Sequence, residues 1–152
     1  MLGIIDTPAD GSRYLAVLGS GAYCGNEPLR VRPTRQLKDA IVTVGDYAVG
    51  EQAQAKNQTR LAVTGPLAQG AQRVRMLSSA AIDLAWLAHG RTDAAIIFGG
   101  KPWDIAAGVI LVREAGGAAV DAHGRRQKIG SAPTVAAAPE LLDQVLDVMA
   151  RP

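Results

Sequence analysis

Short apolar runs alternate with longer segments of helical periodicity along most of this chain. Positions 2–6 and 13–18 are apolar, and the stretch between them, 7–12, is rich in turn formers, so a β-hairpin is predicted there. Glycine-containing stretches at 19–22 and 25–28 are typical of turns. Further strands are predicted at 41–44, 74–77, 94–98, 118–121 and 134–138.

Helical segments separate most of these strands. The clearest helix begins at Ser79, a residue type that caps helix N-termini, and ends at Gly90, which suits a helix C-terminus. Another helix, 103–115, is apolar on all sides and is therefore expected between layers. Two more helices are predicted at 51–71 and 139–150. The Gly-Pro dipeptide inside the first of these should kink or split it. Alternating strands and helices predict an α/β fold, with a layered sheet covered on both faces.

Composition and charge exclude several classes of protein. The 152 residues suffice for one domain with a sizeable core, and the net charge of +2 comes with scattered basic residues. This pattern predicts no nucleic-acid partner. The longest apolar run, 105–112, is too short to span a bilayer, so no membrane partner is expected. A single cysteine, Cys24, cannot form an internal disulfide, which favours a cytoplasmic location.

Two predicted helix N-termini carry the candidate chemistry. Ser78, Ser79 and Ala80 start one helix after a strand, and free N–H groups at such a position suit an anion such as phosphate. Asp104 lies at the start of the other helix, where a carboxylate can either cap the helix or bind a divalent cation. Together they suggest metal-assisted phosphoryl chemistry, although serine is also a common helix cap with no ligand at all.

Three motifs in order resemble the inositol monophosphatase family. Positions 102–108 read Pro-Trp-Asp-Ile-Ala-Ala-Gly and 112–117 read Val-Arg-Glu-Ala-Gly-Gly, similar to the family's C-terminal signature. Positions 75–85 resemble its phosphate-side helix, and 19–31 its hairpin and following turn. The resemblance covers nearly the whole chain and is weakest over 46–72. It implies a layered α/β/α sandwich like the C-terminal half of the family's fold.

The resemblance also implies an activity, which is Mg²⁺-dependent hydrolysis of a small phosphate ester. Asp104 would be a metal ligand and a contact to substrate hydroxyls, and Trp103 would set its angle. The substrate pocket would be lined by Ser78, Ser79 and Ala80. At position 97, where the family often has a glutamate that binds the inositol ring, this chain has Ile97, which opens the substrate class to other sugar or polyol phosphates.

A second departure from the family concerns the N-terminal half of its domain. That half supplies paired glutamates and an Asp-Pro-x-Asp-Gly-Thr loop, and neither is found here. The resemblance therefore divides the chain into 1–33, a hairpin of the truncated N-terminal sheet, and 34–152, the C-terminal α/β domain. We identify no catalytic residue in the chain and expect little turnover from it alone. The alternative is a non-catalytic remnant or an assembly module, with a homo-oligomer formed through the exposed hairpin edge.

Other polar residues receive structural interpretations. Asp6 and Asp10 superficially resemble the family's acidic loop, but their spacing is one residue too wide, so Asp10 is expected in an ordinary hairpin turn. Asp83 and Asp93 flank the Ser79 helix and are expected to be capping or solvated. We expect His89 to be a packing or surface residue and His123 a loop residue. We expect Cys24 to be structural, and Lys101 to be a solvated lysine rather than a contact to a substrate phosphate.

Overall fold

Two β-sheets and four α-helices make up the fold in the computed structural model, which describes residues 1–128 and 132–150. The first sheet is antiparallel and has the order β1-β2-β3-β4. Its strands are β1 (Leu2–Thr7), β2 (Ser12–Val17), β3 (Gly21–Cys24) and β4 (Glu27–Pro28). The hairpin of β1 and β2 was predicted. The composition of the stretches that form β3 and β4 indicated turns, whereas the family resemblance placed a hairpin within 19–31.

The second sheet is mixed and has the order β6-β5-β7-β9-β8. Its parallel part consists of β5 (Ile41–Val44) between β6 (Arg73–Arg75) and β7 (Ala94–Ile97). Its antiparallel part consists of β9 (Thr134–Ala137) beside β7 and β8 (Ala118–Val120). All four residues of β7 and of β9 are buried, because this sheet is covered on both faces.

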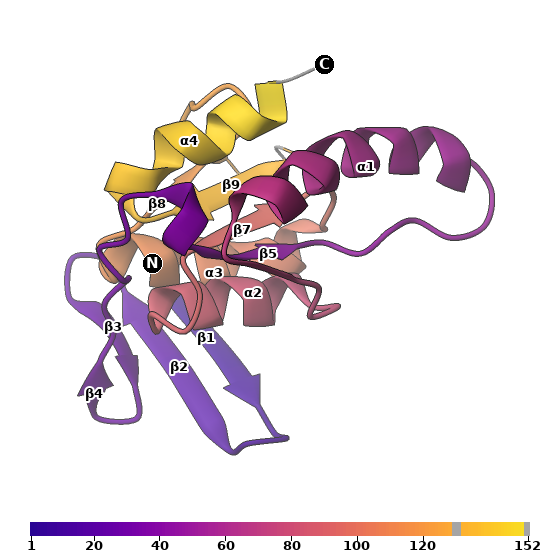
Figure 1. Ribbon diagram of the computed structural model, residues 1–152. Coiled ribbons are helices and arrows are strands. Elements are labelled where there is room, and N and C mark those ends of the chain that lie inside the picture. Colours follow the sequence, from indigo (N-terminus) through magenta and orange to yellow (C-terminus); the bar gives the residue numbers. More distant parts are fainter. Residues whose placement is uncertain (129–131, 151–152) are drawn as a thin grey trace.

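Helices cover the second sheet from both sides (Figure 1). On one side, α1 (Ala53–Gly70) and α4 (Pro139–Ala150) pack over Val42, Ile96 and Val135. On the other side, α2 (Ala80–Ala88) and α3 (Pro102–Glu114) lie between the two sheets. The predicted α/β fold with helices on both faces is therefore confirmed, and so is the interior position of the apolar segment that forms α3.

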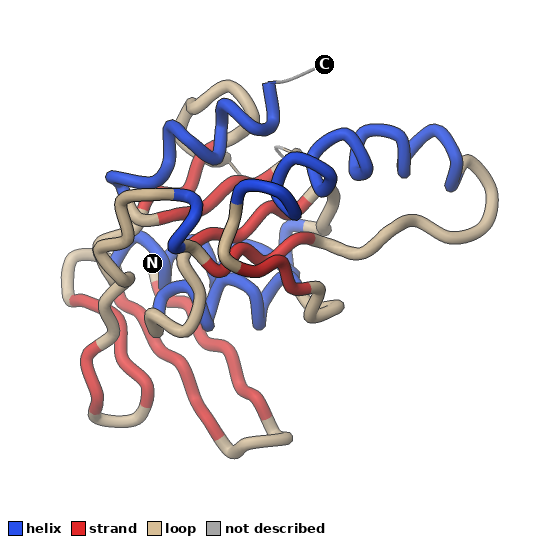
Figure 2. The backbone as a smooth tube through the Cα atoms, viewed as in Figure 1, coloured by secondary structure: helices blue, strands red, loops and turns tan. Residues whose placement is uncertain are grey.

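The helix α1 continues through Pro66, so the Gly-Pro dipeptide does not split it (Figure 2). Proline removes one helical hydrogen bond and crowds the residue before it. Here the preceding residue is Gly65, which has no Cβ to crowd. Burial of Val63 on one side and Leu67 on the other holds both parts of α1 against the core. Tertiary packing therefore outweighs the local penalty of the proline.

The first sheet is attached to the rest of the molecule through α3. The carboxylate of Glu114, the last residue of α3, accepts hydrogen bonds from the backbone N–H groups of Gly19 and Gly21, each at 3.0 Å. These two backbone hydrogen bonds lower the pKa of Glu114. Gly3 on β1 lies so close to α3 that an added Cβ would approach the carbonyl oxygen of Ala107 to 2.9 Å. None of the helices within the described residues is long and apolar enough to cross a membrane.

Candidate active site

The candidate site is a pocket of about 430 Å³ at the carboxyl ends of the parallel strands β5 and β7. Ligands collect at this edge of open α/β sheets, because the loops and helix N-termini there converge. The N-termini of α2 and α3 both face the pocket. Its lining consists of Gly45, Asp46, Ser78, Ser79, Ala80, Ala81, Asp83, Ile97, Gly99, Gly100, Trp103 and Asp104. The structure thus brings all four predicted site residues, Ser78, Ser79, Ala80 and Asp104, into one place.

The start of α2 is shaped by two serines with different backbone conformations. Ser79 is the N-cap, and its Oγ accepts a hydrogen bond from the backbone N–H of Ile82 at 3.4 Å. Ser78 has a φ of +60°, in the left-handed region that costs a non-glycine residue roughly 1–2 kcal/mol. The first N–H groups of a helix have no partner within the helix and carry partial positive charge. Because Ala80 and Ala81 line the pocket, this end of α2 suits an anion or an electron-rich oxygen.

Asp104 holds a position in the first turn of α3. Its Oδ2 accepts a hydrogen bond from the backbone N–H of Lys101 at 3.1 Å, and its own N–H donates to the Lys101 carbonyl at 2.9 Å. Asp104 thus closes the N-terminus of α3 while its side chain stays exposed at the pocket. The cap and the ligand role are therefore compatible, because the hydrogen bond from Lys101 occupies only one carboxylate oxygen.

Trp103 also lines the pocket, but its ring is largely exposed. The Lys101 ammonium lies 5.2 Å from the centroid of this ring, in a cation–π contact. Lys101 itself is exposed, as its interpretation as a solvated lysine requires. The proposed effect of Trp103 on the angle of Asp104 stays a prediction.

Asp83 is the main pocket residue that the sequence interpretation missed. It was expected to be capping or solvated, and this was wrong, because only 2% of it is exposed. Burial raises the pKa of Asp83 from 3.8 to about 6; a hydrogen bond with Thr43 opposes the shift, and the negative charge of Asp46 adds to it. Asp46 lies two residues after the end of β5, so the rule about carboxyl ends of parallel strands could have found it.

Asp93, the other aspartate expected to be solvated or capping, is also buried, and it lies away from the pocket lining. Its Oδ1 accepts a hydrogen bond from Thr34 Oγ1 at 2.6 Å, and its Oδ2 accepts one from the backbone N–H of Ile41 at 2.7 Å. Arg32 Nε lies 3.5 Å from Oδ1. The role of Asp93 is therefore to tie the segment before β5 to the core.

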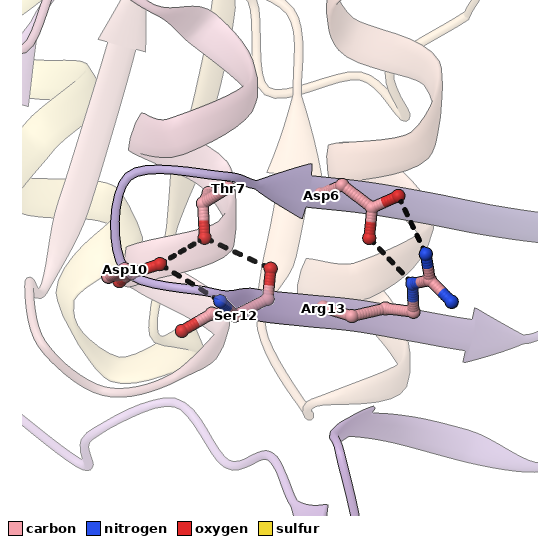
Figure 3. A network of polar contacts seen from close by, with 5 residues as sticks. All are labelled: Asp6, Thr7, Asp10, Ser12 and Arg13. Atoms are coloured by element: carbon pink, nitrogen blue, oxygen red, sulfur yellow. Dashed lines mark hydrogen bonds and ion pairs between the residues drawn. The ribbon is translucent and has the colours of Figure 1, made fainter.

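The two aspartates of the first hairpin form polar contacts within the hairpin (Figure 3) and are not among the residues that line the pocket. Asp10 Oδ1 accepts hydrogen bonds from Thr7 Oγ1 and from the backbone N–H of Ser12, within the turn between β1 and β2. Asp6 forms an ion pair with Arg13 on the neighbouring strand, with 2.6 Å between Oδ1 and Nε. Asp10 therefore belongs to an ordinary hairpin turn, as predicted.

The histidines and the cysteine have no ligand cluster around them. His89 Nδ1 lies 3.4 Å from the hydroxyl of the buried Tyr14, and its Nε2 lies 3.8 Å from Glu27. Cys24 is a free, partly buried thiol. Within the described residues, no group of three or more histidine, cysteine, aspartate or glutamate side chains is placed to hold a metal ion.

The fold and the pocket define an α/β protein with three aspartates and two helix N-termini at a site where parallel strands end. The sequence model of the inositol monophosphatase family matches residues 1–150, and the chain belongs to this family. Among curated relatives, it is 36% identical to Nus factor SuhB of Pasteurella multocida and 35% identical to the probable inositol 1-monophosphatase ImpA of Mycobacterium tuberculosis. These matches cover 96% and 97% of this chain and 54% of each relative.

Solved structures show the same relationship. An IMPase from Thermotoga maritima superposes with a TM-score of 0.87 at 30% identity, covering 97% of this chain and 55% of its own. An inositol monophosphatase from Anabaena (Nostoc) sp. PCC 7120 has a TM-score of 0.89 at 30% identity, covering 99% of this chain and 59% of its own. The chain therefore spans somewhat more than half the length of the relatives it matches.

Proposed function

We propose that this chain is part of a Mg²⁺-dependent phosphomonoesterase of the inositol monophosphatase type and carries only part of its active site. The supporting observation is that Asp104 and the N-terminus of α2 line one pocket at the carboxyl ends of β5 and β7. A carboxylate there suits a divalent cation, and the helix N-terminus suits the oxygens of a phosphate ester or its polyol. The two groups together suit metal-assisted hydrolysis of a phosphate ester.

The donors present fit Mg²⁺ at one ligand position. Mg²⁺ prefers hard oxygen ligands, and the exposed carboxylate of Asp104 provides one. Asp46 and Asp83 line the same pocket, yet the described residues contain no group of three such side chains placed to share an ion. Water molecules and groups outside the described residues would supply the remaining ligands. When bound, Mg²⁺ supplies a Lewis acid for phosphoryl oxygens and lowers the pKa of a coordinated water.

The chain's own residues would bind and orient the substrate. The free N–H groups at the start of α2 would donate hydrogen bonds to an oxygen of the ester, and Asp104 would accept a hydrogen bond from a substrate hydroxyl. Ile97 presents an apolar wall to the same pocket. We infer a substrate class of inositol phosphates or related sugar and polyol phosphates. One relative, from Thermotoga maritima, is named a fructose-1,6-bisphosphatase/inositol-1-monophosphatase, which supports this breadth.

Calorimetry of Mg²⁺ binding tests the role of Asp104 separately from turnover. We expect weak binding that Asp104→Asn removes and that Asp143→Asn, the same substitution on the exposed face of α4, leaves unchanged. Equal binding by all three proteins would contradict the assignment. In a Mg²⁺-dependent assay with inositol 1-phosphate and sugar phosphates, the chain alone should show little or no turnover. Robust activity of the chain alone would overturn the proposal of a partial site.

A second candidate function is that of a non-catalytic assembly module. Strand β1 is the outer strand of the first sheet, so its backbone groups can pair with another chain and give, for example, a homo-oligomer through the hairpin edge. Light scattering across a concentration series tests this candidate. A monomer at all concentrations would contradict self-assembly.

We further propose that the protein acts in the cytoplasm. Its one cysteine, Cys24, is a free thiol, which suits a reducing compartment. Localisation of the tagged chain to an oxidising compartment would contradict this proposal.

A further inference from the structure

The carboxyl group of Asp83 is a buried acceptor that lacks a partner on one of its oxygens. Asp83 is only 2% exposed and lines the candidate pocket, and its Oδ1 accepts no hydrogen bond from the described residues. Burial raises the pKa of Asp83, and the hydrogen bond with Thr43 offsets only part of this rise. A buried acceptor without a partner has lost the hydrogen bonds that water would donate to it. It therefore favours a ligand that carries a donor.

Three carboxylates make the pocket negatively charged. Asp46 and Asp104 line it together with Asp83, and its lining includes no lysine or arginine from the part of the chain that the structure describes. The ammonium group of Lys101 lies instead over the ring of Trp103, 5.2 Å from its centroid. The charge of Asp46 adds to the rise in pKa that burial causes at Asp83, so these two carboxylates repel each other. A positive group between them would remove this repulsion.

An ammonium group suits Asp46 and Asp83 better than a metal ion does. Across the described residues, no three side chains of the metal-binding types are placed to hold an ion. Mg²⁺ requires near-octahedral oxygen ligands and gives up its water reluctantly. A primary ammonium group has three donors and no acceptor. It can therefore donate both to Oδ1 of the buried Asp83 and to the exposed carboxylate of Asp46 without a complete coordination shell.

Another wall of the pocket is apolar and limits what the rest of the ligand can be. Ile97, at the end of β7, is 3% exposed and lines the pocket together with Gly99 and Gly100. The side chains of these residues offer no donor or acceptor to a ligand hydroxyl. A short hydrocarbon chain can lie against them without losing hydrogen bonds that hydroxyl groups would need.

We propose that the pocket takes phosphate esters of amino alcohols, with the ammonium group bound between Asp46 and Asp83 Oδ1. The phosphate oxygens would lie at the N-terminus of α2, whose first N–H groups have no partner within the helix. This assignment extends the substrate class beyond sugar and polyol phosphates. Its phosphate end rests on the proposed function, whereas its ammonium end rests on the two aspartates alone.

Calorimetry with the full chain and Mg²⁺ tests this proposal. The probes are phosphoethanolamine and its three- and four-carbon homologues, each compared with the matching hydroxyalkyl phosphate, in which a hydroxyl group replaces the ammonium group. We expect at least one amine to bind roughly tenfold more tightly than its hydroxyl counterpart. Asp83→Asn should reduce this preference to about twofold or less. Asp143→Asn, the same substitution on the exposed face of α4, should retain it.

Two outcomes would overturn the inference without touching the proposed function. One is equal binding of amine and hydroxyl compounds throughout the series, or a preference that Asp83→Asn leaves intact. The other concerns phosphocholine, which has the same positive charge but no N–H donor. If phosphocholine binds as tightly as the best amine, the ligand forms no hydrogen bond with Asp83.

The remaining outcomes separate the two proposals. Absence of binding in both series would contradict the inference and the proposed function together. An amine preference that depends on Asp83, found alongside Mg²⁺ binding that Asp104→Asn does not change, would sustain the ammonium site and contradict the metal role of Asp104. Urea unfolding of Asp83→Asn shows whether that variant is folded, and we expect it to be, because the substitution removes a buried charge.

Discussion

Replacing Asp93 with asparagine should destabilise the fold, because Asp93 is a fully buried carboxylate with a donor on each oxygen. Thr34 Oγ1 donates to Oδ1 and the Ile41 N–H donates to Oδ2, at 2.6 and 2.7 Å. Asparagine has nearly the same shape but only one acceptor oxygen and no charge. The backbone N–H of Ile41 keeps an acceptor only if the asparagine oxygen faces it. The asparagine NH₂ then faces Thr34, whose hydroxyl has to accept a hydrogen bond in place of donating one.

The magnitude follows from the strength of the two hydrogen bonds. A hydrogen bond to a charged group contributes roughly 1.5–3 kcal/mol, and one between neutral groups roughly 0.5–1.5 kcal/mol. Two such changes sum to about 2–3 kcal/mol, and the smaller desolvation cost of the amide offsets part of it. We expect Asp93→Asn to lower the free energy of unfolding by about 2 kcal/mol. With a urea slope of about 2 kcal/mol per molar, the midpoint should fall by about 1 M.

Urea unfolding followed by circular dichroism measures this change. Asp143→Asn is the control, because it makes the same substitution and charge change at an exposed position of α4. Its midpoint should stay close to that of the unaltered protein. If Asp93→Asn shifts the midpoint no more than Asp143→Asn does, the hydrogen bonds at Asp93 do not stabilise the fold and the reasoning fails.

Three further predictions concern the site and its supports. Gly108→Ala places a Cβ 2.5 Å from Leu84 Cβ, so α2 and α3 must separate. The overpacking should cost about 1–3 kcal/mol and exceed the roughly 1 kcal/mol gained in helix propensity, so the urea midpoint should fall. A raised midpoint would contradict this expectation. The pKa of Asp83 is about 6 when folded against 3.8 ordinarily, so the folded state binds this proton more tightly. That stabilisation is complete below pH 3.8 and is lost as the pH rises through 6. Asp83→Asn should therefore raise the free energy of unfolding at pH 7.5 by at most about 3 kcal/mol, which a higher urea midpoint would show. This gain should vanish near pH 4. A gain independent of pH would refute the pKa assignment. Glu114→Gln should speed amide exchange at Gly19 and Gly21 in NMR, because their acceptor loses its charge, whereas Glu140→Gln on α4 should not; unchanged exchange would show that Glu114 does not hold this turn.

The candidate site was predictable where it depends on helix ends and on motif order. Ser79 is a helix cap in sequence and in structure, and Asp104 lies in the first turn of its helix. Asp46 and Asp83 were not assigned to the site. Asp83 lies in the first turn of α2, a position that is usually solvated, and its burial follows from the packing of α2 against α3 and the second sheet.

The sequence by itself determined the α/β class, the β1–β2 hairpin and its turn, and the bounds of α2 to within a residue or two. Caps, turns and hydrophobic periodicity act over a few residues, so they can be recognised without knowing the rest of the fold. The tertiary structure alone decided the strand order β6-β5-β7-β9-β8, the continuity of α1 through Pro66, and the burial of Asp83 and Asp93. These features depend on contacts between segments far apart in the chain, whose burial and pairing energies exceed the local preferences that the sequence displays.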